Sequence, residues 1–487
     1  MIDTKVLREK ILDLAMRGKL VPQDPNDEPA SELLKRIKAE KEELIKQKKI
    51  KRDKNETEIF KGDDGLHYEK FADGTVNPLL TTLDFPDNWL PIKLSQILRV
   101  SSGKSLKRTQ LTEDGNVPVY GAHGIMGSYS EGFIEKGTLL IGRVGFYAGS
   151  IMRTKEFSWV TDNSLIVSSS SVVNSNFLEL SLKHLNLGSL TSQTAQPVIS
   201  GQKIYSQIIF LPPVNEQTKI VDSYNELISK VNTIEKEQEQ LKQLATQLKQ
   251  KVLDVAMQGK LVPQDPNDEP ASVLLEKIRA EKQRLYEEGK IKKKDLVETE
   301  LVKDGDNAYY QNLPDSWEIV PLKNIVNYRI GKTPNTKNKN YWTNHEGFPW
   351  ISIADMGKDK YIGRTTRKIT NKAVEEVFKG IVSPKGTLIM SFKLSIGKTN
   401  LLGKNSVHNE AIISIFPYWD NNNVLRNYLY LVLPIISNSG ETISAIKGKT
   451  LNSKKIDVLP IPLPTIREQQ EINTKVMLFL RILEIIS

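Results

Sequence analysis

Apolar residues recur every three to four positions over one long stretch in the middle of the 487-residue chain. The positions are Ile220, Tyr224, Leu227, Val231, Ile234, Gln238, Leu241, Ala245, Leu248, Val252 and Val255. This 4-3 spacing predicts a coiled-coil helix. Pro212 and Pro213 exclude an earlier start, and Gly259 ends it. About 40 residues at a rise of ~1.5 Å give a helix of roughly 60 Å, whose apolar seam needs a partner.

The two ends of the chain supply fragments of the same pattern. Near the C-terminus the apolar positions are Ile472, Val476, Phe479, Leu483 and Ile486, and near the N-terminus they are Leu7, Ile11 and Leu14. Neither end is long enough to cover the central helix alone. We therefore expect residues 463–487 and 1–17 to lie end to end as a split second helix, antiparallel to the central one.

Internal repeats account for this arrangement. The segment "GKLVPQDPNDEPAS" starts at Gly18 and again, unchanged, at Gly259. "LPPVNEQTKIV" from Leu211 resembles "LPTIREQQEIN" from Leu463. "FPDNWLPIKLSQI" from Phe85 resembles "LPDSWEIVPLKNI" from Leu313, and a Gly-Lys pair follows each, Gly103-Lys104 and Gly331-Lys332. The chain is predicted to consist of two half-copies related by an approximate two-fold axis.

The identical 14-residue segment has two interpretations. It is a suitable helix stop, because prolines and Asp or Asn residues favour tight turns. Strict identity beside diverged globular regions favours a surface that binds one partner twice, and we prefer this interpretation. The candidate partner-binding residues are Gly18, Lys19, Leu20, Val21, Pro22, Asp24 and Asp27 in the first copy, and Gly259, Lys260, Leu261, Val262, Pro263, Asp265 and Asp268 in the second.

Between the helical regions the pattern changes to short β-type runs such as "GTLLIGRV" and "GTLIMSF", separated by turns rich in glycine, asparagine and serine. These runs predict two compact α+β domains. The expected order is an N-terminal helical region (1–58), a first globular domain (59–212), a central helical region (213–300), a second globular domain (301–462) and a C-terminal helix (463–487).

Composition narrows the class of protein. The chain has no cysteine, which excludes disulfides and thiolate metal sites and is typical of a reducing cytoplasm, our expected location. No apolar stretch is long enough to predict a membrane span. A net charge of +9 is compatible with a polyanionic partner such as DNA.

Basic and amide side chains cluster with aromatic residues in equivalent parts of the two globular domains. Lysines there can hold phosphates, while Arg, Gln and Asn can read purine edges. The candidates are Lys104, Lys107, Arg108, Gln110, Tyr120, His123, Arg143 and Gln196 in the first domain, and Lys332, Thr333, Asn335, Lys337, Lys339, Tyr341, Lys393, Lys398, Lys447 and Lys449 in the second. Alternatively these are solvated loops whose aromatic residues belong to the core, which is the interpretation we favour for Trp350.

Known catalytic motifs are missing from the sequence. "SSGKS" and "IGKTP" lack the first glycine of a nucleotide-binding loop, where Leu98 and Val326 stand. The five histidines form no HExxH motif, and no Asn-Pro-Pro-aromatic motif of a base methyltransferase is present. The acidic residues of the repeated segment do not have EF-hand spacing, so no metal is expected. The sequence indicates recognition rather than catalysis.

The "LPxxxEQ" ends of the two domains, the repeated segment after a helix, and "GKTPNTKNKNYW" with "FPWISIADM" from Gly331 resemble specificity subunits of type I restriction-modification systems. The resemblance covers essentially the whole chain. It implies two target-recognition domains, each reading half of a split, asymmetric site in double-stranded DNA. It also implies conserved helices that dock two copies of a DNA methyltransferase subunit, to which a motor-nuclease subunit can be added.

In that family the chain itself is not catalytic and holds no cofactor, because the methyltransferase subunits bind S-adenosylmethionine. The first domain departs from the second in having "GKSLKRTQLTEDGNVPVYGAH" where the second has Gly-Lys-Thr-Pro and Tyr-Trp, so its loop is expected to read different bases. Two alternatives remain open at this stage. One is a coiled-coil adaptor that binds protein, and the other is a divergent methyltransferase or nuclease.

Overall fold

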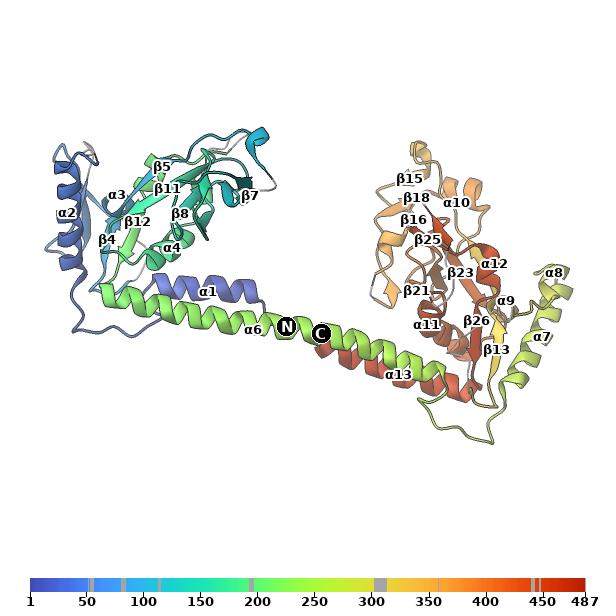
Figure 1. The fold of residues 1–487 in the computed structure, drawn as a ribbon. Helices are drawn as coiled ribbons and strands as arrows, with labels where there is room; N and C mark the ends of the chain where they lie inside the picture. Colours follow the sequence, from blue (N-terminus) through green and yellow to red (C-terminus); the bar gives the residue numbers. More distant parts are fainter. Residues whose placement is uncertain are drawn as a thin grey trace. The chain divides into compact units, whose positions relative to one another are not determined.

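The chain folds into two compact units, Met1–Gln238 and Glu239–Ser487, each built from helices and sheets (Figure 1). The computed structural model describes residues 1–50, 52, 57–79, 85–112, 115–191, 197–301, 313–357, 359–438, 443–445 and 448–486. The first part of helix α6 (Val214–Met257) belongs to one unit and its last part to the other. It begins directly after Pro213 and ends two residues before Gly259, as predicted. The expected α+β class is confirmed.

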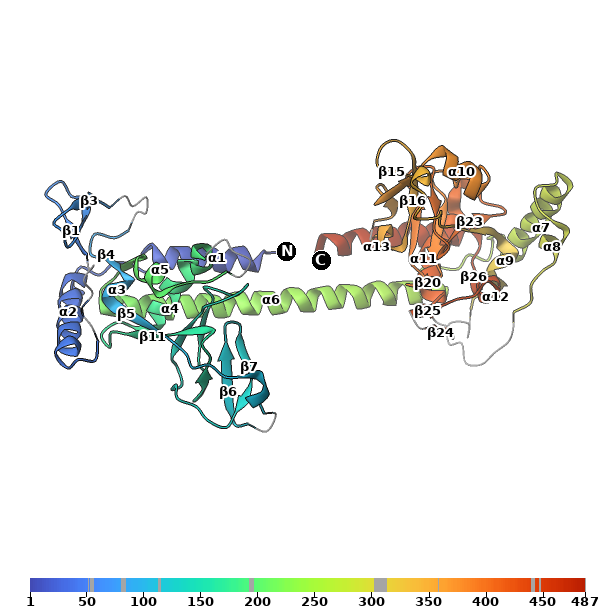
Figure 2. The same ribbon diagram turned by 90° about the horizontal axis from the view of Figure 1, so that it is seen from above.

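In the first unit, α1 (Thr4–Met16) lies antiparallel along α6 (Figure 2). The backbone N–H of Ile2 donates to Gln238 Oε1 at 2.8 Å, and Gln238 Nε2 donates back to the Ile2 carbonyl at 3.1 Å. At the other end of α1, Ala15 and Met16 share an apolar core with Ile220. The antiparallel packing predicted for residues 1–17 is therefore confirmed. The polar residue in the seam, Gln238, satisfies backbone groups just before α1.

In the second unit, α13 (Ile466–Ile486) packs against the last part of α6. Ile472 and Val476 of α13 share one core with Leu253 and Met257 of α6. The predicted seam is wrong in detail here. Leu241 and Leu248 are 39% and 44% exposed, because they lie outside this core, while Leu253, Ala256 and Met257 are buried instead. The end-to-end arrangement of the two split segments stays a prediction.

The described residues of the globular part of the first unit form four sheets. Their strand orders are β1 (Glu58–Lys61)–β2 (His67–Lys70)–β3 (Val76–Pro78), β4 (Leu90–Lys93)–β12 (Ile208–Leu211), β5 (Leu98–Ser102)–β11 (Ser164–Ser169)–β8 (Leu139–Gly142)–β9 (Ile151–Arg153), and β10 (Trp159–Val160)–β6 (Val117–Gly121)–β7 (Gly124–Tyr129). Its helices are α2 (Ala30–Lys46), α3 (Leu94–Ile97), α4 (Ser175–His184) and α5 (Gly201–Tyr205). Residues of α2, α4 and the β5 sheet form its main core.

The second unit repeats this plan with additions. The sheets are β13 (Glu318–Pro321)–β26 (Pro460–Leu463), β14 (Val326–Ile330)–β23 (Ile412–Pro417)–β19 (Leu388–Ser391)–β21 (Thr399–Leu402)–β17 (Tyr361–Ile362), β15 (Trp342–Thr343)–β18 (Arg367–Ile369)–β16 (Phe348–Ile351)–β22 (Val407–His408), and β20 (Lys393–Leu394)–β25 (Gly448–Thr450)–β24 (Ile443–Ala445). The helices are α7 (Ala271–Glu287), α8 (Lys293–Leu296), α9 (Leu322–Ile325), α10 (Asn371–Phe378), α11 (Val424–Ile436) and α12 (Ser453–Asp457).

The repeated sequence motifs come together in each unit. Gly18 has a φ of +65°, and a Cβ there would lie 2.4 Å from Pro86 Cγ. Gly259 has a φ of +69° and would meet Pro314 at the same distance. Only glycine accepts both the left-handed backbone and the close proline. The "FPDNW" and "LPDSW" motifs are therefore the packing partners of the repeated segment.

A tryptophan and a buried glutamate complete this arrangement, which we call the clasp: the repeated segment, the tryptophan of the adjoining motif and the glutamate of "LPxxxEQ". In the first unit Trp89 Nε1 and Gln23 Nε2 donate to Glu216 Oε1 at 2.9 Å and 2.6 Å. Burial raises the pKa of Glu216. In the second unit Trp317 Nε1 donates to Glu468 Oε2 at 2.8 Å.

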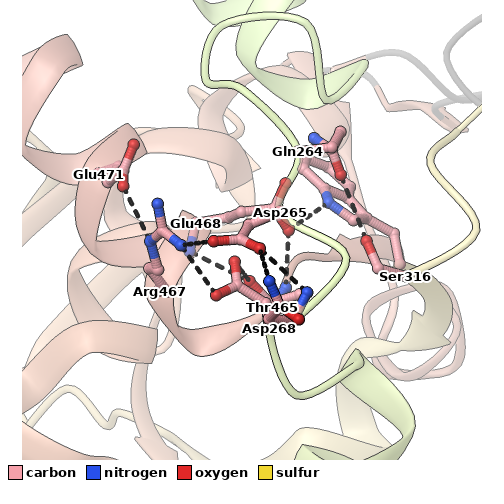
Figure 3. A network of polar contacts seen from close by, with 10 residues as sticks. Gln264, Asp265, Asp268, Ser316, Thr465, Arg467, Glu468 and Glu471 are labelled. Atoms are coloured by element: carbon pink, nitrogen blue, oxygen red, sulfur yellow. Dashed lines mark hydrogen bonds and ion pairs between the residues drawn. The ribbon is translucent and has the colours of Figure 1, made fainter.

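The aspartates of the repeated segment form ion pairs inside the clasp. In the second unit Arg467 contacts both Asp265 and Asp268, and Glu471 lies one helical turn further on (Figure 3). In the first unit Lys219 contacts Asp24 at 3.6 Å and Asp27 at 3.3 Å. The cation that pairs with these aspartates is thus in the first turn of α13 in the second unit. In the first unit it is one turn further along α6. These aspartates have an internal structural role, and partner binding by the segment stays a prediction.

Burial divides the other candidates in the segment into two groups. Val21 and Val262 belong to apolar cores, and Leu20 and Leu261 pack against those cores. Lys19, Lys260, Pro22 and Pro263 are exposed. The exposed group offers the most accessible side chains, while Leu20 and Leu261 are half-buried. Among the described residues, no helix is long and apolar enough to cross a membrane.

Candidate nucleic-acid interface

The Gly-Lys pairs occupy the same place in both globular domains. The Gly103 N–H donates to the Ser164 carbonyl at 3.2 Å, and Gly331 N–H donates to Ile412 at 3.1 Å. A Cβ on Gly103 would lie 2.2 Å from the Thr161 carbonyl oxygen, and a Cβ on Gly331 would lie 2.1 Å from that of His408. Glycine is therefore required by close backbone approach, and the loop that follows is fixed against the strand beneath it.

A tryptophan indole holds the next residue in each domain. Trp159 Nε1 donates to the Lys104 carbonyl at 3.2 Å, and Trp350 Nε1 donates to the Lys332 carbonyl at 3.0 Å. The two tryptophans come from opposite strands of the equivalent pair. Trp159 on β10 pairs with Val119 on β6, whereas Trp350 on β16 pairs with Val407 on β22. Both domains therefore have the same contact, but the tryptophan that makes it stands on the other strand of the pair. Trp350 is 7% exposed, which confirms its prediction as a core residue.

The lysines of the two pairs are exposed but make contacts within their domains. Lys104 Nζ lies 4.2 Å from the Phe133 ring centroid and 5.9 Å from that of Trp159. Lys332 Nζ donates to the Val377 carbonyl at 2.9 Å. Each ammonium is thus held in place at the surface.

Several other candidates of the first domain are exposed at the surface. Lys107, Arg108 and Gln110 are exposed around the short 3-10 helix Arg108–Gln110. His123 is exposed and stacks on Tyr147 with ring centroids 3.8 Å apart, and Arg143 Nη1 donates to Ser102 Oγ at 3.2 Å. Gln196 lies outside the described residues.

The structure corrects the interpretation of Tyr120. This residue is 3% exposed and belongs to an apolar core with Leu140, Val160 and Ile166. Its hydroxyl accepts a hydrogen bond from the Lys155 N–H at 3.1 Å. Because strand β6 turns the side chain inward, Tyr120 is a core residue and not a candidate for DNA contact.

In the second domain the loop after Gly331 is held by side-chain contacts. Thr333 Oγ1 donates to Glu410, and Tyr341 donates to Glu376 at 2.7 Å, which raises the pKa of Tyr341. The Asn335 carbonyl accepts from Trp342 Nε1 at 3.2 Å. Lys337 and Lys339 are exposed.

Two of the last candidates, Lys393 and Lys449, lie on the β20–β25–β24 sheet of this domain. Strand β25 pairs with β20, so that Lys449 stands opposite Leu394 and next to the register position of Lys393. Lys398 is exposed on the loop that follows β20. Lys447 lies outside the described residues. The backbone therefore brings Lys393 and Lys449 to neighbouring strands although 56 residues separate them in sequence (449 − 393).

One basic residue of this surface was missed by the sequence analysis. The Arg367 guanidinium carbon lies 5.1 Å from the ring centroid of Trp342. Together with Lys339 and Lys368 these residues line an open pocket of about 310 Å³. Arg367 stands in "RTTRKI", 36 residues after Gly331, and only the strand pairing of β15 with β18 places it beside the loop.

A buried polar network lies beneath the loop of the second domain. His408 Nε2 and Ser414 Oγ are 2.6 Å apart, and Ser414 Oγ and Ser383 Oγ are 2.7 Å apart. Burial lowers the pKa of His408 to about 4. His408 follows the position of Val407 on β22 just as Val160 follows Trp159 on β10, so an apolar residue of one domain is replaced by histidine in the other. This histidine is neutral near pH 7 and acts as a structural residue.

Among the described residues, no group of three or more His, Asp or Glu side chains is arranged to hold a metal ion. The surface around each Gly-Lys pair instead combines exposed cations with aromatic rings, a combination suited to phosphates and base edges.

Comparison with known proteins assigns the family. The model of the type I restriction modification DNA specificity domain matches residues 86–243 and 314–486, once in each half. The EcoAI specificity subunit of Escherichia coli is 30% identical over 455 residues, which cover 82% of this chain and 74% of that one. The EcoEI specificity subunit of Escherichia coli is 30% identical over 402 residues, 68% of this chain and 63% of that one. The chain therefore belongs to the family of type I restriction enzyme specificity subunits, the DNA-recognition components of these systems.

A solved chain of a type I R-M system has the same fold, with a TM-score of 0.52 and 16% identity, over 82% of this chain and 92% of that one. The two ranges matched by the family model confirm the internal repeat deduced from the sequence.

Proposed function

We propose that each globular domain reads one half of a two-part, asymmetric site in double-stranded DNA. The observation that carries this proposal is the duplicated Gly-Lys loop, which is held by the same backbone contacts in both domains but surrounded by different side chains. A shared frame with different side chains is what two readers of different sequences need. Cations at the rim bind phosphates without regard to sequence, while amide and guanidinium groups distinguish bases.

We further propose that the helices dock two copies of a DNA methyltransferase subunit, which binds S-adenosylmethionine and carries out the reaction, with room for a motor-nuclease subunit in the complete enzyme. Apolar side chains exposed on helices support this. They are Ile2 and Val6 around α1, Leu241, Leu244 and Leu248 on α6, and Leu478 and Ile482 on α13. Large exposed apolar residues on charged helices are typical of protein interaction sites.

The presence of a similar clasp in each unit supports two docking sites of the same kind. Gly18, Trp89 and Glu216 in one unit correspond to Gly259, Trp317 and Glu468 in the other. Because the clasp fixes the end of a helix against the globular domain, it would set the same angle between helix and reader in both halves.

The first test measures DNA binding of the full chain at several salt concentrations. Several neutralised phosphates predict an affinity that falls steeply, as a power of the salt concentration. Methyl transfer from S-adenosylmethionine should require the methyltransferase subunit. A salt-independent affinity would favour the protein-binding adaptor, and methyl transfer by the chain alone would favour a hidden enzyme. Either result would overturn the proposal.

A further inference from the structure

An open pocket lies beside the paired strands β15 and β18. Six of its lining residues are Thr336, Lys339, Trp342, Asn344, Arg367 and Lys368. None of these is acidic, and three carry positive charge. The pocket opens to solvent next to the loop that starts at Gly331, so a polyanion bound at that loop would reach it.

Arg367 is presented in a fixed orientation. Its guanidinium lies over the Trp342 ring, with 5.1 Å between the guanidinium carbon and the ring centroid. Among the described residues no carboxylate forms an ion pair with it. The carboxylate of Asp355 accepts a hydrogen bond from the neighbouring Thr366 hydroxyl at 2.7 Å instead. An arginine stacked on an aromatic face keeps its planar set of donors ready for a ligand.

Trp342 is itself held firmly. Its indole N–H donates to the Asn335 carbonyl at 3.2 Å, and its ring packs edge to face on Trp350 with centroids 5.1 Å apart. Trp350 in turn donates to the Lys332 carbonyl. A continuous chain of contacts therefore connects Arg367 to the Gly-Lys loop, and the position of one determines the position of the other.

The equivalent place in the first domain follows from the strand registers. On β16 and β18, Trp350 pairs with Arg367, and on β6 and β7, Val119 pairs with Gly127. The carbonyls of Val160 and His408 accept the N–H of Lys104 and of Lys332. Val119 and Trp350 are equivalent because each pairs with the residue just before that carbonyl. Arg367 therefore corresponds to Gly127.

The residues beside these positions also correspond. Thr343 pairs with Lys368, and Thr112 forms a bridge to Ser128. The residue before each threonine is Trp342 in one domain and Leu111 in the other. Leu111 covers Gly127, since a Cβ on that glycine would lie 3.2 Å from Leu111 Cδ1. Where the second domain presents an arginine on a tryptophan, the first presents leucine over glycine, without charge.

From this difference we infer that Arg367, held over the ring of Trp342, determines specificity in the second domain by reading the O6 and N7 acceptors of a guanine in the half-site bound there. The inference rests on the proposed DNA-reading function. Arginine matches this acceptor pair with two parallel hydrogen bonds from a planar set of donors, whereas lysine is a point charge on a flexible stem. Lys339 and Lys368 flank the pocket as the phosphate contacts, and Lys368 Nζ is already held by the His345 carbonyl at 3.1 Å.

The test expresses the full chain with its methyltransferase subunit and sequences the methylated DNA. The variants are Arg367→Gln, whose amide pairs with adenine rather than guanine, and Arg367→Ala, with the exposed Arg364→Ala as a matched control. Both Arg367 variants should lose preference for one guanine about 10-fold or more. The other half-site and the control should be unchanged. An unchanged motif with Arg367→Gln, or equal weakening of all sequences with Arg367→Ala, would overturn the inference.

A second measurement uses DNA that carries 7-deazaguanine at the identified position, which removes the N7 acceptor. The wild-type chain should bind this DNA about 10-fold more weakly than the normal site, while Arg367→Ala should show no further loss. An equal loss in both proteins would also overturn the inference. If the wild-type complex methylates no defined site at all, the proposed function fails first and takes this inference with it.

Discussion

The indole N–H of Trp89 donates a 2.9 Å hydrogen bond to the buried carboxylate of Glu216, although 127 residues separate the two in sequence. Trp317 and Glu468 make the corresponding bond in the second unit. A carboxylate that has left water needs such donors, because a buried charge without hydrogen bonds is costly. This contact fixes the start of a long helix to the globular domain beside it.

Removal of this acceptor should weaken the first unit. Glu216→Ala leaves the Trp89 N–H and the Gln23 amide without their shared acceptor, and the free energy of unfolding should fall by about 1–3 kcal/mol. Glu237→Ala, an exposed position on the same helix, should have little effect. Urea denaturation followed by tryptophan fluorescence measures both. Equal stability of the two variants would show that the clasp contributes nothing.

Acid should destabilise the second unit through His408. The ordinary pKa of 6.5 applies in the unfolded chain, and burial lowers the pKa to about 4 in the folded one. Between these values the unfolded chain binds more protons, so the free energy of unfolding rises with pH. The contribution is complete above pH 6.5 and is lost as the pH falls toward 4, by about 3 kcal/mol in total.

The variant His408→Val places at this position the residue type that Val160 provides in the first domain. Ser383 and Ser414 keep their mutual hydrogen bond, so the network is not left without partners. Unfolding of the variant should depend less on pH between 6.5 and 4 than unfolding of the wild type. Denaturation curves at pH 7 and pH 5 give the free energy of unfolding at each pH. An equal loss between the two pH values in both proteins would rule out His408 as the cause.

The Gly-Lys loop should tolerate no side chain at its glycine. In Gly331→Ala the new Cβ would lie 2.1 Å from the His408 carbonyl oxygen, which forces the loop outward. DNA affinity of the full chain should fall about 10-fold, because the loop supports the cations around it. Gly363→Ala is the control, since a Cβ there meets nothing within 4 Å. Wild-type affinity in Gly331→Ala would remove this loop from the interface.

Docking of the methyltransferase subunit should depend on the exposed side of α13. Leu478 is 61% exposed, and Leu478→Glu should weaken binding of that subunit about 10-fold while DNA binding by the chain alone stays unchanged. Gln470→Glu puts the same charge at an exposed position of α13 two turns away, about 80° around the helix from Leu478, and serves as the control. Calorimetric titration with the methyltransferase subunit distinguishes them. Equal affinity of both variants would exclude this helix face.

The helices and repeats were predictable from the sequence because their signals are local. Pro213 and Gly259 mark the ends of α6, and the spacing around Ile220 and Val231 gives its buried side. The exposure of Leu241 was not predictable, because it depends on how far the core with α13 extends along α6.

The candidate interface was predictable only in part. Glycine followed by lysine in equivalent places identified both loops. Tyr120 was misread because a short strand gives no clear alternation to show which side faces inward. Arg367 was missed because its place beside Trp342 depends on pairing between strands, which side-chain types along the chain do not reveal.

The most direct test of two independent readers exchanges one of them. Residues 313–463 are replaced by the corresponding segment of a relative with a different target, and the methylated DNA of cells that express the chimera with its methyltransferase subunit is sequenced. One half of the recognised site should change, while the other half stays as it is in the wild type. A change in both halves, or in neither, would contradict the account.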